Sequence, residues 1–244
     1  MRYYTLLKRG YDHPEFCQDF LFSENYKNGL YIGAVFDGCS SGVDSHFASS
    51  LFSKIIAESV RLEILNFGEL DLKQFSEKVF YNFMIKLKET KKNLHLTQNE
   101  ILSTFLMMVY ERDAKSACII AAGDGVININ GEIKIIDQNN KPKYPAYFID
   151  EIENFDDFSR WNENENLNIF VQDVKDISIS TDGISSFVKR NPAEISEFDV
   201  FDFLLNNNEL KQIEVMLKRK YNIICNKQNM QNYDDIAVIR IIAS

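Results

Sequence analysis

Cysteine, proline and tryptophan are scarce in this sequence, which has four, four and one of them among 244 residues. No two cysteines have the CxxC spacing, which argues against a zinc site and against a disulfide framework. Reduced thiols in a cytoplasmic protein are the simpler interpretation. With few prolines and 45% hydrophobic residues, the chain has the composition of a compact globular protein.

Long apolar runs and an excess of basic residues are also missing. The N-terminal segment MRYYTLLKRG lacks the apolar core of a signal peptide, and no stretch approaches the roughly 18 apolar residues that span a bilayer. Lys and Arg number 27 against 36 Asp and Glu, a net charge of −9. Nucleic-acid binders usually show a basic excess. We therefore expect a cytoplasmic protein whose partner is neither a membrane nor a nucleic acid.

The period of the hydrophobic pattern changes along the chain. Short runs rich in aromatic and branched residues predict three strands before residue 38, namely YYTLLK, DFLFSE and LYIGAVFD. Helical spacing follows from Ser45, at the N-cap, to about Leu65, and again in an apolar stripe from Phe75 to Leu87. STFLMMVYE, SACIIAAGD and GVININGEIKIID predict further strands, and the Asn-Gly pair in the last predicts a type I′ hairpin.

In the second half of the chain the hydrophobic pattern is less regular. Residues 139–173 show no clear period, and an irregular segment of that length is more often functional or mobile than idle. VKDISISTDG predicts a strand entering a turn, residues 195–205 and 210–221 predict helices, and DIAVIRII predicts a closing strand. Hairpin-linked strands with helices in separate blocks indicate an α+β protein of antiparallel sheets covered by helices. Since no composition break divides the chain, we expect one domain over residues 1–244.

Acidic residues stand at the ends of the predicted strands. Carboxylates at strand ends come together when the strands share a sheet edge, and they repel one another unless a cation lies among them. Carboxylate oxygens suit Mg²⁺ or Mn²⁺. Each Asp-Gly pair alone is compatible with an ordinary turn, but several at strand ends predict an acidic divalent-metal site. The residues are Asp19, Asp37, Asp124, Asp182, Asp234 and Asp235.

Five short motifs follow one another along the chain: CQDF, VFDG, AAGDG, ISTDG and NYDDIAVIRI. In this order, with a helical block after the second, they resemble the motifs of PP2C-type metal-dependent serine/threonine phosphatases, most closely the bacterial branch with variant motifs. The resemblance extends from about Gly10 to Ile241. It implies a four-layer α-β-β-α sandwich, two antiparallel sheets flanked by helices, with the metal ions at one end of the sheets.

The resemblance also implies a role for each acidic residue. Asp37 would bridge two Mg²⁺ or Mn²⁺ ions, and the backbone carbonyl of Gly38 would bind one of them. The other ligands implied are Asp182 and Asp234 at the first ion, Asp19 near the second through water, and Asp124 with Asp182 at a weaker third ion.

The activity implied is hydrolysis of phosphoserine or phosphothreonine in phosphoproteins, the products of a serine/threonine kinase. A water held between two cations has its pKa lowered toward neutrality and attacks phosphorus as hydroxide. No phosphoenzyme forms in this reaction. The sequence accordingly has neither a Cys-x5-Arg loop nor a DxD motif with a nucleophilic aspartate.

Three positions depart from the common family pattern. Cys39 stands where the family usually has a histidine that protonates the leaving group, and a thiol is a weaker acid than imidazolium. His46 is the other candidate for that acid. Gln18 replaces a glutamate ligand and should bind the second ion less tightly. The phosphate-binding arginine has two candidate replacements, Arg9 and His13; we prefer His13, because a histidine before CQD belongs to the motif in some bacterial branches.

Two alternatives remain open. Cys39 and Gln18 suggest a pseudophosphatase that keeps the fold as a phosphopeptide-binding or regulatory module. Against it, clustered carboxylates bring no advantage to a purely structural descendant. Another acidic metallohydrolase, such as a nuclease, would need a local basic patch to contact its substrate.

Overall fold

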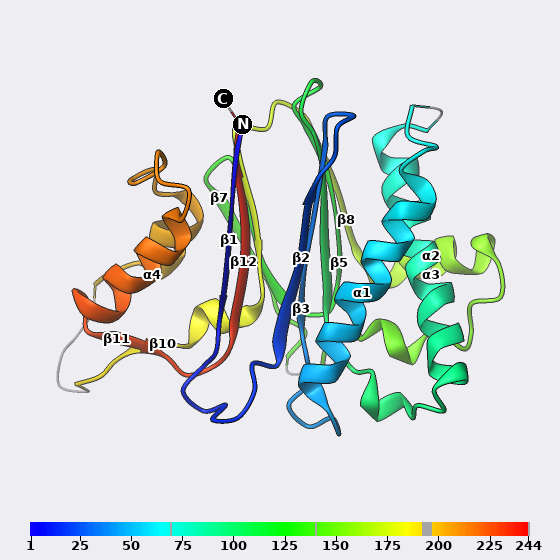
Figure 1. Ribbon diagram of the computed structural model, residues 1–244, viewed down its shortest axis with the longest axis horizontal. Coiled ribbons are helices and arrows are strands. Elements are labelled where there is room, and N and C mark those ends of the chain that lie inside the picture. Colours follow the sequence, from blue (N-terminus) through cyan, green and yellow to red (C-terminus); the bar gives the residue numbers. More distant parts are fainter. Residues whose placement is uncertain (69, 140, 192–196, 244) are drawn as a thin grey trace.

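The computed structural model describes residues 1–68, 70–139, 141–191 and 197–243. Two five-stranded antiparallel sheets pack face to face, and helices cover the outer face of each (Figure 1). The strand orders are β1-β12-β9-β6-β7 and β2-β3-β4-β5-β8. The predicted α-β-β-α sandwich is therefore confirmed.

The first sheet joins the two ends of the chain, because β1 pairs along its whole length with β12. Its β6–β7 hairpin turns at Asn130 and Gly131, whose φ angles of 54° and 95° are those that the predicted type I′ turn requires. The helix α4 (Met216–Asn226) and the short π-helix η4 (Asp202–Asn206) cover this sheet. Its strands are β1 (Arg2–Lys8), β12 (Ile236–Ile242), β9 (Asp176–Ser180), β6 (Gly125–Ile129) and β7 (Glu132–Ile136).

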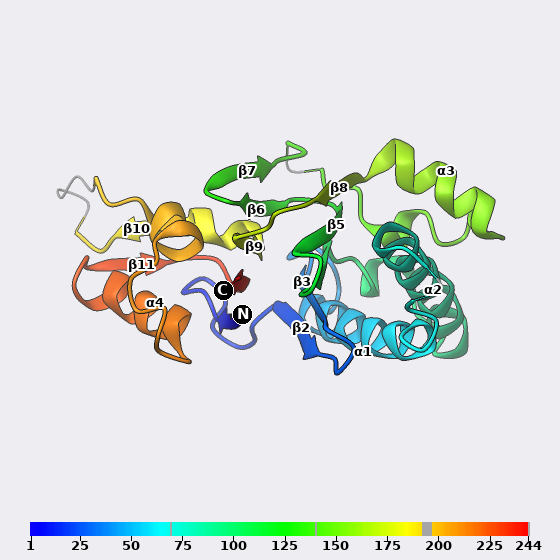
Figure 2. The same cartoon turned by 90° about the horizontal axis from the view of Figure 1, so that it is seen from above.

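The second sheet is covered by three helices, which Figure 2 shows together on its outer side. The helix α2 starts with a capping box between Asp71 and Gln74, and the predicted apolar stripe from Phe75 to Leu87 is buried. The elements are β2 (Asp19–Asn25), β3 (Leu30–Asp37), β4 (Phe105–Glu111), β5 (Ser116–Ala122), β8 (Leu167–Val171), α1 (Ser45–Glu63), α2 (Leu72–Asn93) and α3 (Phe155–Glu165).

Three apolar cores lie between the four layers, and this follows from strands that bury both faces. Residues of β3 alternate between two of them: Phe36 packs under the helices, whereas Val35 packs between the sheets. In the same way Val238 of β12 faces α4 and Ile239 faces the second sheet. Strands buried on both sides read as continuous apolar runs, and LYIGAVF and IAVIRI have this character.

Several element predictions were wrong in detail. Ser45, predicted as the N-cap of the first helix, is the first residue of α1, and Asp44 is the N-cap. Residues 139–173 are not irregular throughout, because they contain the 3-10 turn η2 (Pro145–Tyr147), α3 and β8. The helix predicted over 210–221 begins only at Met216, after a series of turns. Leu210, at the start of the predicted range, has a φ of +63° that helical backbone does not allow. The helix predicted over 195–205 falls partly outside the described residues. The elements not yet named are η1 (Gln98–Glu100), η3 (Asp182–Ser186), β10 (Phe187–Lys189) and β11 (Met230–Asn232).

Candidate functional site

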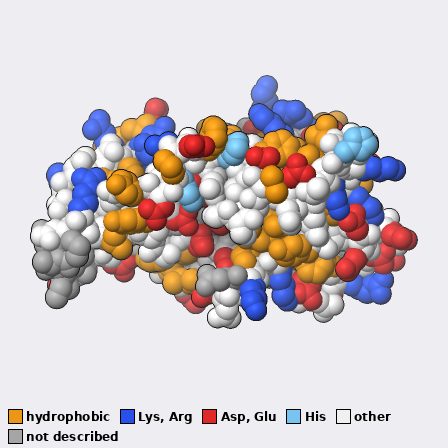
Figure 3. All heavy atoms as spheres, turned by 90° about the horizontal axis from the view of Figure 1, so that it is seen from below, with side chains coloured by type: hydrophobic (Ala, Val, Ile, Leu, Met, Phe, Trp, Pro, Cys, Tyr) orange, Lys and Arg blue, Asp and Glu red, His pale blue; other side chains and the backbone are white. Residues whose placement is uncertain are grey.

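The strand ends bring the predicted acidic residues to one end of the sandwich. Asp37 is the last residue of β3 and Asp19 the first of β2, and the antiparallel register places them directly opposite each other. Asp182 follows β9 and Asp234 precedes β12, and these two strands are antiparallel neighbours. Figure 3, which shows this end of the molecule, has acidic side chains gathered near the middle of the face.

Asp37 is held by a reciprocal pair of hydrogen bonds with Thr104. Its backbone N–H donates to the Thr104 hydroxyl (3.0 Å), and its carbonyl accepts from the Thr104 N–H (2.8 Å). Gly38 continues the strand with a donation to the Gln18 carbonyl (3.1 Å). A Cβ atom on Gly38 would lie 2.1 Å from the carbonyl oxygen of Ser45, so only glycine lets α1 start this close to the strand end.

Asp19 is almost fully buried, and its carboxylate accepts a hydrogen bond from the Thr181 hydroxyl at 2.6 Å. The same hydroxyl oxygen accepts from the N–H of Ala237 (2.9 Å). Thr181 therefore ties a β2 carboxylate of one sheet to β9 and β12 of the other. Thr181 stands in the motif ISTDG, but its hydrogen bond to Asp19 was not predicted, because it depends on the packing of the two sheets.

The neighbours Asp234 and Asp235 differ in burial and in their hydrogen bonds. Asp235 is buried and accepts hydrogen bonds from the backbone N–H groups of Gly10 (2.6 Å) and Gln18. It thus fixes the loop before β2 against the start of β12. Asp234 is half-exposed and is oriented by the N–H of Asp235, which donates to its Oδ1 at 2.7 Å. Gly183 approaches Asp235 so closely that a Cβ atom would lie 1.6 Å from its carbonyl oxygen.

Asp124 lies in the short connection between β5 and β6, where the chain crosses from one sheet to the other. Its Oδ1 accepts a hydrogen bond from the N–H of Gln138 at 2.7 Å. Its charge contributes to the raised pKa of Asp182. Asp124 is thus near Asp182, as the family motifs imply, and stands beside the main cluster.

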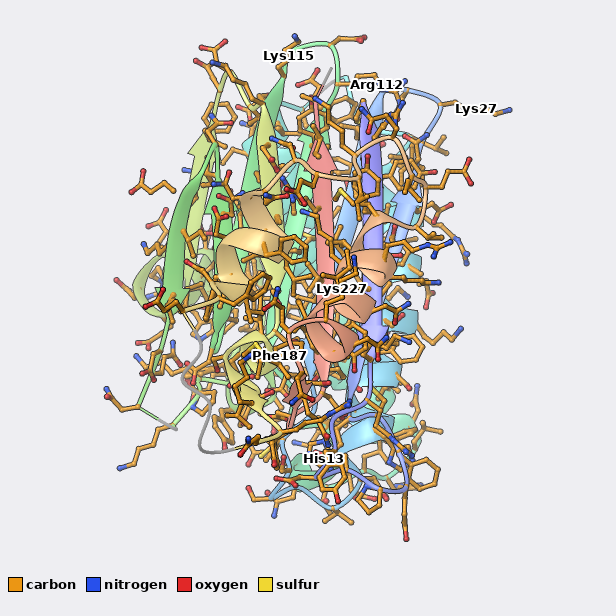
Figure 4. All side chains as sticks on the ribbon, turned by 90° about the vertical axis from the view of Figure 1, so that its left-hand side faces the viewer. His13, Lys27, Arg112, Lys115, Phe187 and Lys227 are labelled. Atoms are coloured by element: carbon orange, nitrogen blue, oxygen red, sulfur yellow. The ribbon has the colours of Figure 1, made fainter. Side chains whose placement is uncertain are left out.

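His13 lies at the same end of the molecule, as Figure 4 shows, whereas Lys27, Arg112 and Lys115 lie at the opposite end. Its Nδ1 is 2.9 Å from Asp235 Oδ2 and 3.6 Å from Asp234 Oδ1. His13 Nδ1 has no hydrogen-bond partner among the described residues. His13 lowers the pKa of Asp234, although burial leaves that pKa above its usual value.

Cys39 follows the Asp37-Gly38 pair, and its N–H donates to the carbonyl of Leu102 (3.0 Å). Its Sγ lies 3.2 Å from the hydroxyl oxygen of Ser41. Burial alone would raise the thiol pKa, but hydrogen bonds from the hydroxyls of Ser41 and Tyr144 and from backbone amides outweigh it, so the pKa is lowered. Tyr144 comes from the segment predicted to be irregular.

The buried carboxylates raise one another's pKa. Burial and the charges of Asp19, Asp182 and Asp234 raise the pKa of Asp37 well above its usual value. The pKa of Asp19 is raised in the same way, mainly by burial. Burial and the charge of Asp234 raise the pKa of Asp182 to about 6. Among the described residues no Lys or Arg forms an ion pair with any of these carboxylates, so the cluster keeps an excess of negative charge.

The donor set fits a hard divalent cation, because carboxylate oxygens that repel one another are stabilised by positive charge among them. Within the described ranges, however, no three Asp, Glu, His or Cys side chains are close enough to form a ready-made metal site. The nearby Asp19 instead raises the pKa of Asp37. The side chains would therefore have to turn toward an ion in order to coordinate it together.

The family model for protein phosphatase 2C matches residues 9–218. The chain belongs to the protein phosphatase 2C family. No sequence among the curated proteins matches it. The predicted family is thus confirmed over most of the chain.

Solved structures of phosphatases of this family share the fold at low sequence identity. SpoIIE from Bacillus subtilis has a PP2C domain with a TM-score of 0.56 and 17% identity, which covers 99% of this chain and 63% of that one. PstP/Ppp from Mycobacterium tuberculosis has a TM-score of 0.61 and 12% identity, and the match covers 100% of this chain and 99% of that one. RsbX in complex with magnesium has a TM-score of 0.50 and 15% identity, and the match covers 98% of this chain and 92% of that one. This chain therefore spans less than two thirds of the SpoIIE fragment.

Proposed function

We propose that the protein hydrolyses phosphoserine or phosphothreonine in phosphoproteins with two, or three, Mg²⁺ or Mn²⁺ ions bound among the clustered aspartates. The observation that carries this proposal is the convergence of four carboxylates at one end of a PP2C fold, without a Lys or Arg partner among the described residues. Asp19 is buried, and Asp37, Asp182 and Asp234 are partly exposed. The magnesium complex of the similar RsbX is in keeping with it.

Bound cations would supply Lewis acidity that lowers the pKa of water and offsets charge on the phosphoryl oxygens. Asp37 and the Gly38 carbonyl would hold ions at the strand end, with Asp182 and Asp234 on the first-sheet side. Asp19 would act near the second ion, and Asp124, beside Asp182, would hold the weaker third. Asp235 and Thr181 position these carboxylates through the hydrogen bonds described above.

Two residues would act on the phosphate itself. His13 is our candidate for the cation that binds the phosphoryl group, since it approaches Asp234 and Asp235 from the loop before β2. Cys39 is our candidate for the acid that protonates the leaving alkoxide, and its thiol is oriented by hydrogen bonds to Ser41 and Tyr144. His46 remains the alternative acid.

The substrate proposal follows from the family, whose members act on phosphoproteins, and makes a serine/threonine kinase the source of the substrate. A nucleic acid or a membrane forms no part of the proposal. Among the described residues, no helix has the length and apolar character that crossing a bilayer requires. All four cysteines are free, which is in keeping with a cytoplasmic location, and we treat residues 1–244 as one domain.

The test is hydrolysis of p-nitrophenyl phosphate and of a phosphothreonine peptide by wild-type protein with Mn²⁺ and with EDTA. We expect turnover only with the metal, and a loss of at least about a hundredfold in Asp37→Ala and in Asp182→Ala, because each removes a charge from the cation site. Asp173→Asn is the matched control: it is exposed, precedes β9, and has a φ of +55° that asparagine tolerates.

Activity that survives in both alanine variants would overturn the assignment. The second candidate is a phosphopeptide-binding module without turnover, which Cys39 and Gln18 favour. Calorimetry separates the two, because the module would bind Mn²⁺ or phosphopeptide and yet release no phosphate from any substrate.

A further inference from the structure

A cavity of about 370 Å³ opens beside the carboxylate cluster. One wall is the loop before β2, residues 12–18, and the other is the segment 40–46 that leads into α1. The cavity adjoins the cluster because His13, 2.9 Å from Asp235, lines it together with Gln18. A group bound at the cluster would therefore have this cavity next to it.

The cavity carries three exposed carboxylates, those of Asp12, Glu15 and Asp44. None of them forms an ion pair with a Lys or Arg in the described part of the chain. Asp44 stands at the N-cap of α1, yet its side chain makes no capping hydrogen bond. Its carboxylate is therefore available to a ligand, and the three charges together favour a cationic one.

An aromatic ring completes the cationic character of the site. Phe16 lines the cavity and remains 55% exposed although its ring stacks on His46, with centroids 4.3 Å apart. An ammonium or guanidinium group near an aromatic ring is attracted by the ring quadrupole. An exposed phenylalanine beside carboxylates thus suits the stem and head of a lysine or arginine side chain.

One wall residue of the cavity, Gln18, has an unsatisfied side-chain acceptor. The Oε1 atom of Gln18 is buried and accepts no hydrogen bond from the described residues. A buried acceptor without a donor costs free energy.

The wall that presents these groups is held in place. Arg9 donates from Nη1 to the carbonyl oxygens of Pro14 (2.6 Å) and Glu15 (3.4 Å). Asp235 fixes both ends of the same loop through the N–H groups of Gly10 and Gln18. The subsite is thus largely formed before a ligand arrives, which reduces the entropy lost on binding.

We infer that this cavity, with Asp12, Glu15, Asp44 and Phe16, is a specificity subsite for a lysine or arginine side chain close in sequence to the phosphorylated residue. The inference rests on the proposed phosphatase function and deepens it by naming a substrate class, phosphoproteins with a basic residue beside the phosphorylation site. A nucleic-acid ligand is disfavoured because its phosphates would meet three carboxylates.

The experiment compares phosphothreonine peptides that differ at one flanking position, scanned on both sides, with Lys, Gln or Glu. The quantity measured is the ratio of kcat/KM for the Lys peptide to that for the Gln peptide. We expect a ratio above one at one or two positions, and a fall of about 1.5- to 5-fold in each of Glu15→Gln and Asp44→Asn, the range of an exposed charge pair. Glu15→Lys should reverse the preference, and Glu132→Gln on the exposed edge of β7 should leave the ratio unchanged.

Two results would overturn the inference: no preference for Lys at any position, or a preference that persists in Glu15→Gln, Asp44→Asn and Glu15→Lys. Failure of the proposed function would look different, since p-nitrophenyl phosphate would also not be hydrolysed with Mn²⁺. If the protein has no phosphatase activity, the subsite is tested by fluorescence anisotropy, which measures the affinity for the same peptides carrying a label. The variants are the same, and the same two results would overturn the inference.

Discussion

Charged side chains lie at both ends of the neighbouring strands β9 and β12, and they have partners of opposite charge at only one of the two ends. At the functional end Asp182 and Asp234 join a cluster of carboxylates. At the other end Asp176 of β9 meets Arg240 of β12, with Arg240 Nε 2.9 Å from Asp176 Oδ1 and Nη2 2.5 Å from Oδ2. Arg240 is fully buried.

The second cluster is completely satisfied. Arg240 also donates to the carbonyl oxygens of Leu204 (3.0 Å) and Asn206 (2.6 Å), which end the π-helix η4. Lys220 of α4 donates to the carbonyl oxygens of Phe203 (2.6 Å) and Asn207. Burial and the charge of Arg240 lower the Lys220 pKa to about 8. These two cations thereby attach η4 to the first sheet and to α4.

The difference separates a structural use of buried charge from a functional one. Arg240 and Asp176 neutralise each other. At the functional end, burial and the charges of Asp182 and Asp234 raise the pKa of Asp19 and of Asp37, and none of these four carboxylates has a Lys or Arg partner in the described residues. The first arrangement stabilises the fold. The second is unfavourable to the empty fold at neutral pH, and binding of a divalent cation relieves it.

The largest effect should come from breaking the satisfied cluster. Arg240→Met removes the cation from a buried pair and leaves the Asp176 carboxylate and several carbonyl groups without donors. We expect the free energy of unfolding to fall by about 3–5 kcal/mol, measured by urea denaturation with EDTA. A loss below about 1 kcal/mol would show that the pair does not anchor η4. Arg112→Met, at an exposed turn, is the control.

The acidic cluster should make stability depend on pH in a direction that can be assigned. The pKa of Asp182 is raised to about 6 in the folded protein, against about 3.9 when unfolded. Asp182 therefore stays protonated to a higher pH in the folded state than in the unfolded state. Its protonation adds up to about 3 kcal/mol to the free energy of unfolding below about pH 4, and this contribution is lost as the pH rises to 6. We expect wild-type stability in EDTA to fall relative to Asp182→Asn over that window.

The measurement is urea denaturation of both proteins at pH 4 and pH 6.5, with Asp173→Asn alongside. A constant difference between wild type and Asp182→Asn at the two pH values would contradict the raised pKa. Saturating Mn²⁺ should remove or reverse the trend, because metal binding favours the deprotonated carboxylates.

Much of the architecture was predictable because the strands are short continuous apolar runs and α2 carries a continuous apolar stripe. The helix α3 was not predicted because the polar run WNENEN shows no apolar period. Phe155, Phe158 and Trp161 nevertheless have helical spacing, and Asn154 caps the N-terminus of the helix. In hindsight the Asn cap followed by two aspartates in the first turn was the available indication.

The site was predictable only in part. Asp-Gly and Asp-Asp pairs at strand ends identified the acidic residues, since strand ends meet at a sheet edge. The sequence does not indicate which residue of Asp234-Asp235 turns inward, and Asp235 does so because Gly10 and Gln18 present N–H groups there. The contacts of Thr181 with Asp19 and of Tyr144 with Cys39 join distant segments, so they leave no local pattern in the sequence.

Thermal unfolding of wild type and Asp37→Asn, each with EDTA and with Mn²⁺, tests most directly whether the carboxylate cluster exists to hold a cation. In EDTA the variant should unfold at a temperature a few degrees higher, because one repelling charge is gone. Mn²⁺ at about a hundred times its Kd should raise the wild-type Tm by roughly 5–10 °C and leave the variant nearly unchanged, so that the order of the two reverses. Equal shifts in both proteins, or none in either, would contradict the account.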